Sequence, residues 1–246
     1  MAEPPSLSIV IPAYCEAENI LDTLENVTRA LESLPVISEI IVIDDGSPDG
    51  TGALVTANLS RFASVRLLTN ERNLGFGASY RRGVEAATLD YIVMVHGDNA
   101  WGHATLRELF SHVGEADIII GYTRHMWRNR TWRRTLISKT FTLAVNLIAQ
   151  RWLTYYNGLQ IHRAPVLKSL RIESRGYGFQ AEVLVKALRC TRTYREVAMD
   201  LTERTRGESQ AFRLKNVIDV ARTLMLLCAL PWSRSAPAGV ARAAGR

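Results

Sequence analysis

Polar side chains stand directly after five short apolar segments of the sequence. The segment YIVMV at 91–95 runs into His96, Gly97 and Asp98. A carboxylate at the end of a buried strand can hold a divalent cation, or accept hydrogen bonds from ribose hydroxyls and base N–H groups. A single carboxylate follows this segment, with a histidine two residues before it, so both chemistries stay open. The other segments are followed by Pro12, Ala13, Tyr14 and Glu16, by Asp44 and Asp45, by Asn73 and Gly75, and by Arg124.

A regular alternation of apolar and amphipathic segments positions these residues. We predict strands at 7–11, 40–43, 65–68, 91–95 and 118–120, with helices between them at 16–34, 51–62, 77–87 and 105–113. Strands that are apolar throughout, separated by amphipathic helices, are typical of a parallel sheet covered on both faces. Such an open α/β sheet binds its ligand beyond the carboxyl ends of its strands. The fold class is therefore α/β, with the polar strand ends gathered at one edge.

Two common nucleotide-binding motifs are missing from the sequence. Pro12-Ala13-Tyr14 stands where a dinucleotide-binding protein would have G-x-G-x-x-G, and no P-loop sequence occurs. The sequence thus argues against an NAD enzyme and a P-loop kinase. A single strand-end residue such as Ser47 or Asn73 could equally be a helix cap or a turn former.

The composition is that of a globular protein with an uneven distribution of charge. The chain has 246 residues, 47% of them hydrophobic, and a net charge of +6. Three separated cysteines without metal-ligand spacing predict a reducing compartment, and the N-terminus does not read as a secretory signal. Between Asp117 and Glu173 every charged residue is Lys or Arg. A block of one sign predicts an anionic partner: nucleic acid, phospholipid headgroups or a phosphorylated substrate.

The segment LISKTFTLAVNLIAQRWL at 136–153 is strongly apolar and close to membrane-spanning length. Lys139, Asn146, Gln150 and Arg151 interrupt it, and a span of about 20 apolar residues tolerates such groups poorly. Two interpretations stay open: a helix in the protein core, or a helix lying on a membrane surface beside the Arg and Trp residues of 127–134. A second apolar helix is predicted at 217–230, followed by a basic tail at 231–246 that we expect to be disordered.

Seven motifs together carry a family resemblance. In chain order they are IVIPAYCEAENI, IVIDDGSPDGT, NERNLGFGAS, GDN, RRTLISK, GYGFQAEVL and ERTRGES. On these motifs the chain resembles the inverting family 2 glycosyltransferases, and within them the dolichyl- or polyprenyl-phosphate mannosyltransferases. The resemblance implies a GT-A fold in one domain at 1–230, with a nucleotide-sugar-binding half at about 1–121 and an acceptor-binding, membrane-facing half at about 122–230.

The resemblance also assigns roles by residue match. The donor-binding positions are Pro12, Ala13, Tyr14, Glu16, Asp44, Asp45, Gly75, Asp98 and Arg206. The positions that meet the acceptor phosphate are Arg124, Arg134, Ser138 and Arg204, and the catalytic positions are Asp98, Arg124, Arg134 and Arg204. The family usually holds Mg²⁺ or Mn²⁺ through an Asp-x-Asp, and here His96 stands at the first of those positions. His96 and Asp98 could bind the metal together, Asp98 could bind it with phosphate oxygens alone, or basic residues could replace it.

The implied function is transfer of a sugar, with mannose from GDP-mannose favoured, to a polyprenyl or dolichyl phosphate at the membrane surface. An anionic phosphate acceptor needs no strong base, whereas a hydroxyl acceptor would need one, and Glu182 is then the first candidate. The alternatives are a UDP-sugar-dependent transferase with another acceptor, or an inactive homologue that binds nucleotide or lipid. A nucleic-acid partner ranks last because the strand-end carboxylates repel phosphate. We expect a cytoplasmic protein attached peripherally to the membrane, directly or through a separate anchoring subunit.

Overall fold

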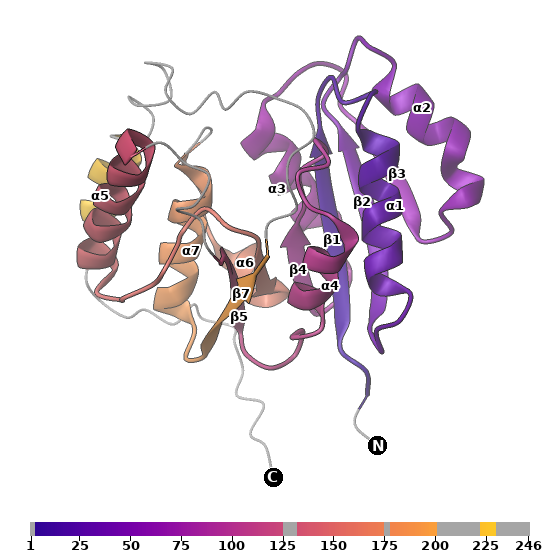
Figure 1. Ribbon diagram of the computed structural model, residues 1–246. Helices are drawn as coiled ribbons and strands as arrows, with labels where there is room; N and C mark the ends of the chain where they lie inside the picture. The colour runs from indigo at the N-terminus through magenta and orange to yellow at the C-terminus, as the bar shows by residue number, and fades with distance from the viewer. Residues whose placement is uncertain (1–2, 125–131, 175–177, 201–221, 230–246) are drawn as a thin grey trace.

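A computed structural model describes residues 3–124, 132–174, 178–200 and 222–229 of the chain (Figure 1). Within these residues seven strands form one sheet in the order β3-β2-β1-β4-β6-β5-β7. All neighbours pair in parallel except β6, which is antiparallel to β4 and β5. The strands are β1 (Ser6–Ala13), β2 (Ile37–Asp44), β3 (Val65–Thr69), β4 (Tyr91–Met94), β5 (Ile118–Thr123), β6 (Gln160–Arg163) and β7 (Tyr194–Met199).

Helices cover both faces of the sheet because successive strand side chains point to opposite faces. Ile9 of β1 belongs to a core cluster with residues of three helices on one face, and the next residue, Val10, belongs to the cluster on the other face. The first face carries α1 (Ile20–Leu31), α2 (Thr51–Asn58) and α4 (His103–Phe110); the second carries α3 (Phe76–Ala86), α6 (Ala164–Ser169) and α7 (Phe179–Cys190). The predicted α/β class, its five strands and the helices between them are confirmed.

The predicted sheet was incomplete, since β6 and β7 were not expected from the sequence. β6 has the sequence QIHR, a run of four residues with Ile161 as its one aliphatic side chain. Its first three residues are nevertheless buried, because β4 and β5 pair with the strand on its two sides. Pairing with the two neighbouring strands therefore makes this segment a strand, and the hydrophobic pattern of its four residues could not predict it.

The apolar segment at 136–153 forms most of α5 (Trp132–Ala149), and its two faces differ. Val145 is fully buried in a cluster with α7, whereas Leu136, Leu143 and Leu147 are 57%, 49% and 60% exposed. Asn146 is buried and holds the turn after the helix: its side chain accepts from the Leu153 N–H at 2.9 Å and donates to the Leu153 carbonyl at 3.1 Å. One face thus belongs to the core, and the other presents leucines to solvent.

No helix of the described segments has both the length and the apolar character needed to cross a bilayer. Residues 222–228 form a short helix beside α5, and Leu227 packs in the same core cluster as Val145. The rest of the helix predicted at 217–230 and the tail at 231–246 lie outside the described residues.

Candidate functional site

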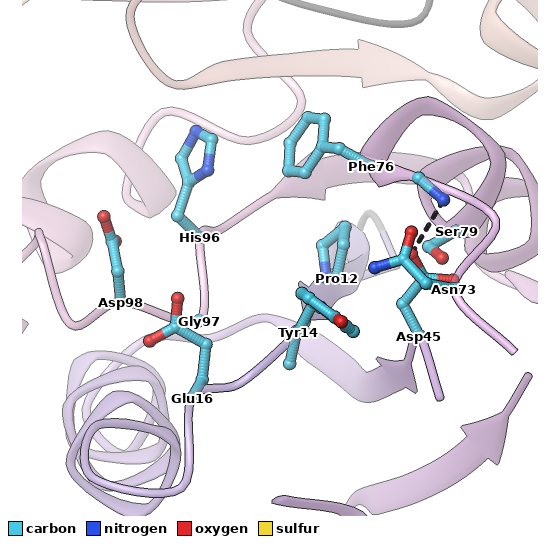
Figure 2. A pocket seen from close by; sticks show the side chains of 12 residues that line it. Pro12, Tyr14, Glu16, Asp45, Asn73, Phe76, Ser79, His96, Gly97 and Asp98 are labelled. Atoms are coloured by element: carbon cyan, nitrogen blue, oxygen red, sulfur yellow. Dashed lines mark hydrogen bonds between the residues drawn. The ribbon is translucent and has the colours of Figure 1, made fainter. Parts of the chain in front are cut away.

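A cavity of about 260 Å³ lies at the carboxyl ends of β1, β2 and β4 (Figure 2). It brings together ten of the residues that the sequence singled out, although they are spread along the chain from position 12 to position 98. The lining consists of Pro12, Ala13, Tyr14, Glu16, Asp45, Asn73, Gly75, Phe76, Ser79, His96, Gly97 and Asp98. Phe76 and Ser79 were not predicted. They follow Gly75 on α3 and lie within the NERNLGFGAS motif, which was the sequence signal that could have indicated them.

Asp45 closes the loop between β3 and α3. Its side chain is 2% exposed and accepts three hydrogen bonds: from Asn70 Nδ2 at 2.7 Å, from the Leu74 N–H at 2.9 Å and from the Gly75 N–H at 2.8 Å. A carboxylate offers about four acceptor positions, so Asp45 keeps capacity for a ligand in the cavity. Gly75 has a φ of 89°, a backbone conformation that glycine adopts without strain.

Asp44 has a different position from its neighbour. It is buried at the end of β2, is not among the lining residues, and accepts a hydrogen bond from the Ser47 N–H at 3.1 Å. A Cβ added to Gly52 would lie 2.3 Å from its Oδ2, so the carboxylate packs tightly against the start of α2. Asp44 therefore shapes the loop after β2 and does not face the cavity.

The IDDGSPDGT motif joins the first two strand-end loops. Its side chains accept hydrogen bonds from the backbone of the loop after β1: Ser47 from Cys15 N at 3.1 Å, Thr51 from Glu16 N at 3.0 Å, and Asp49 from Ala17 N at 3.0 Å. These contacts fix the backbone that carries Tyr14 and Glu16 at the cavity. The IDDGSPDGT motif thus holds the loops after β1 and β2 together through side-chain hydrogen bonds.

Glu16 and Asp98 lie on one side of the cavity, with Asp45 on the other (Figure 2). Partial burial raises the pKa of Glu16 above its ordinary value, a donation from Asn19 lowers it, and the negative charges of Asp98 and Asp49 raise it further. Two neighbouring carboxylates that repel one another on one side of a cavity favour a cation or a hydrogen-bond donor between them. In the described part of the chain, no three His, Cys, Asp or Glu side chains group closely enough to form a metal site by themselves.

His96 lines the cavity with its ring stacked on Phe76. The ring centroids are 5.2 Å apart and the planes differ by 9°. Phe179 of α7 meets Phe76 edge-on at 6.1 Å and Tyr80 edge-on at 5.2 Å. The imidazole is therefore one end of an aromatic cluster that extends from the cavity to the second half of the chain.

Two of the residues predicted for the acceptor, Arg124 and Ser138, are described by the structure and are not among the residues that line this cavity. Arg124 follows β5 with its side chain 53% exposed, donates from Nη2 to the Ala198 carbonyl at 3.3 Å, and has Nε 3.6 Å from Asp200 Oδ1. Ser138 is half-buried on α5, and Arg134 belongs to the first turn of that helix. Arg204 and Arg206 lie outside the described residues.

Glu182 of α7 is fully buried and is used inside the fold. It accepts hydrogen bonds from Lys186 Nζ at 2.5 Å, from the Glu173 N–H at 2.9 Å and from the Ser174 N–H at 2.7 Å. Burial acts to raise the pKa of Glu182, but these donors outweigh it and hold the pKa below its ordinary value. A carboxylate with three donors, absent from the cavity lining, does not have the position of a general base.

Together the sheet and cavity define an α/β protein with a polar cavity beyond the carboxyl ends of its parallel strands, where open α/β sheets bind their ligands. Residues 8–171 match the model of "Glycosyl transferase family 2". The undecaprenyl-phosphate mannosyltransferase of Micrococcus luteus is 31% identical over 82% of this chain and 85% of its own length. The polyprenol monophosphomannose synthase of Mycolicibacterium smegmatis is 32% identical over 82% of this chain and 79% of its own length. The chain belongs to glycosyl transferase family 2.

Solved structures confirm the GT-A fold. Glucosyl-3-phosphoglycerate synthase from Mycobacterium tuberculosis, in complex with Mn²⁺, UDP and phosphoglyceric acid, superposes with a TM-score of 0.70. It is 20% identical, and the match covers 92% of this chain and 80% of that one. At this identity the likeness concerns the fold alone.

Proposed function

We propose that the chain transfers a sugar, with mannose from GDP-mannose favoured, to the phosphate of a polyprenyl or dolichyl lipid and inverts the anomeric carbon. The cavity carries this proposal, because it gathers Tyr14, Glu16, Asp45 and Asp98 where the family binds its nucleotide donor. The two relatives above, whose names state sugar transfer to or synthesis on a polyprenyl lipid, support the acceptor.

The donor would enter with its nucleoside between the loops after β1 and β2. Glu16 and Asp45 can accept hydrogen bonds from ribose hydroxyls or base N–H groups, and the exposed ring of Tyr14 offers a face on which the base can stack. The diphosphate would then lie toward His96 and Asp98 at the end of β4. This orientation points the sugar toward the second half of the chain, where the acceptor residues were predicted.

The reaction on this proposal is a direct displacement. An oxygen of the lipid phosphate attacks the anomeric carbon, the bond from that carbon to the donor diphosphate breaks, and the nucleoside diphosphate leaves with the electron pair. The acceptor is already anionic at neutral pH, so no side chain has to remove a proton. The engagement of Glu182 within the fold agrees with a reaction that uses no base there. Catalysis then depends on positioning and on stabilising the leaving charge.

A divalent cation fits the end of β4. Mg²⁺ and Mn²⁺ are commonly bound through one or two carboxylates together with substrate phosphates, and Asp98, with Glu16 beside it, provides that donor chemistry. When bound, the ion would neutralise charge on the diphosphate.

Transfer activity tests this proposal directly. Purified protein is incubated with labelled GDP-mannose or UDP-glucose, Mn²⁺ and a short polyprenyl phosphate in detergent, and the lipid product is extracted. We expect a mannosyl lipid, and a loss of at least about 100-fold in Asp98→Asn. Asp22→Asn is the matched control, because it removes an exposed carboxylate from the first turn of α1. A glucosyl lipid would assign the UDP donor instead, and bound nucleotide without any product would indicate an inactive homologue.

We further propose that the exposed face of α5 rests on the membrane that holds the acceptor. Its leucines lie in a part of the chain whose charged residues are all basic, as anionic headgroups require. The test is flotation with vesicles of anionic or neutral lipid. We expect Leu143→Gln with Leu147→Gln to reduce binding to anionic vesicles, while Ile37→Thr, which changes a comparably exposed side chain at the start of β2, leaves it unchanged. Wild-type protein that does not float with either vesicle would contradict peripheral attachment without an anchoring subunit.

A further inference from the structure

The cavity lining has a marked imbalance of charge. It contains the carboxylates of Glu16, Asp45 and Asp98, and no Lys or Arg is among the described residues that line it. A nucleoside diphosphate brings further negative charge into this space, so it needs hydrogen-bond donors as well as any cation. Among the described lining residues, His96 is the one side chain with a ring N–H, and a neutral imidazole already provides one donor.

The stacking of His96 on Phe76 limits the directions in which the imidazole can donate a hydrogen bond. Two rings with planes 9° apart leave the imidazole nitrogens only the edge directions in which to make hydrogen bonds. Phe76 is held in turn, because Phe179 meets it edge-on and Tyr80 meets Phe179 in the same way. The orientation of His96 is thus set by residues of α3 and α7, while Asp98 follows it on a separate turn.

We propose that His96 donates a hydrogen bond to the diphosphate of the bound nucleotide, and that Phe76 is the positioning residue that holds its ring for this contact. This inference rests on the proposed nucleotide-sugar function and deepens it. A carboxylate at position 96 could contact a phosphate only through a metal ion, whereas an imidazole N–H contacts it directly. The consequence is that nucleoside diphosphate binding keeps a metal-independent component in this chain.

Calorimetric titration with GDP, GMP, UDP and UMP, each in EDTA and in Mn²⁺, tests the contact. We expect His96→Ala to lower the affinity for the preferred nucleoside diphosphate about 10-fold in EDTA, which is the effect of one lost hydrogen bond to a charged group. The affinity for the corresponding monophosphate should stay within about twofold of the wild-type value. We expect His96→Asp to lose diphosphate binding in EDTA and regain it in Mn²⁺. A defect of His96→Ala confined to Mn²⁺ would identify the ring as a metal ligand and overturn the proposal.

The role of Phe76 is tested with Phe76→Leu and with Phe76→Tyr, which keeps the ring. We expect Phe76→Leu to reproduce the loss seen in His96→Ala, to add nothing in the double variant, and to abolish the ring-current shift of the His96 carbon-bound protons in NMR spectra. Phe76→Tyr should retain both the shift and the affinity. Additive losses in the double variant would assign Phe76 a merely structural role and overturn the positioning claim.

Two further outcomes separate this inference from the function on which it rests. A wild-type chain that binds neither GDP nor UDP would overturn both. If the wild type binds the diphosphate and His96→Ala binds it equally well both in EDTA and in Mn²⁺, this inference alone would be overturned.

Discussion

Replacing Glu182 with Gln separates a structural carboxylate from a catalytic one. The side chain has no exposed surface and accepts hydrogen bonds from Lys186 and from the N–H groups of Glu173 and Ser174. Glutamine has the same shape but keeps a single acceptor oxygen, so its NH₂ group must face at least one of these donors. The change also removes the charge that pairs with Lys186 at 2.5 Å.

The magnitude follows from the remaining partners of Lys186. Breaking a buried ion pair typically costs about 3–5 kcal/mol. Lys186 is 12% exposed, donates also to the Arg171 carbonyl at 2.7 Å, and lies 3.7 Å from the Glu173 carboxylate, so part of its charge stays compensated. We therefore expect the lower end of the range, about 3 kcal/mol in the free energy of unfolding. Glu173→Gln is the matched control: that carboxylate is 51% exposed, and its loss should cost less than about 1 kcal/mol.

The assay combines urea unfolding with sugar transfer measured well below the unfolding transition. We expect the folded Glu182→Gln variant to keep kcat within about tenfold of the wild type, because the acceptor phosphate needs no base. A general base contributes about 10²–10⁴-fold to a rate. A variant with wild-type stability and a kcat lower by such a factor would refute both the structural role and the base-free mechanism.

Three more perturbations test other parts of the fold. Asp45→Asn leaves one donor of the loop at 70–75 without its acceptor; we expect about 1–3 kcal/mol lower stability in urea and at least tenfold weaker nucleotide binding by calorimetry. Burial lowers the pKa of His162 to about 4. The unfolded chain therefore takes up a proton at this histidine below pH ~6.5, while the folded chain does not. The free energy of unfolding should then fall by up to about 3 kcal/mol between pH 6.5 and 4. Urea unfolding at each pH measures this dependence, which His162→Gln should reduce. Gly158→Ala places a Cβ 2.0 Å from the Gly121 carbonyl oxygen, and since a backbone atom cannot move aside cheaply we expect a loss of at least about 2 kcal/mol, measured by urea unfolding.

The first half of the fold could be predicted because its strands are continuous apolar runs that helices bury on both sides. Ile40, Ile41, Val42 and Ile43 are all 1% exposed or less, and such a run has few other ways to lose contact with water. The second half has weaker signals. In β7, with the sequence YREVAM, two adjacent charged residues interrupt the apolar pattern at the edge of the sheet, and the strand is identified by its pairing with β5.

The nature of the α5 segment could not be decided from sequence for a related reason. Its composition fits a core helix and a membrane-surface helix equally, because both are apolar with a few polar breaks. The structure buries Val145, so one face of the helix belongs to the core, and it leaves Leu143 exposed on the face that we propose meets the membrane. Asn146, which counted against an apolar environment, is satisfied by the turn at 153 and so is compatible with burial.

The candidate site also has a part that follows from the sheet topology and a part that depends on side-chain packing. Parallel strands end at one edge, so the gathering of Glu16, Asp45 and Asp98 follows once the strands are recognised. The chemistry at position 96 does not follow from topology, because it depends on Phe76 of α3, whose ring stacks on His96 and also contacts Phe179 of α7. A histidine in place of a carboxylate looks in the sequence like a damaged metal motif. Stacked on an aromatic neighbour in a cavity lined by three carboxylates, it has the surroundings of a donor to an anion. If that is its role, Phe76 and His96 form a functional pair, and changing either one alone should lose what changing both loses.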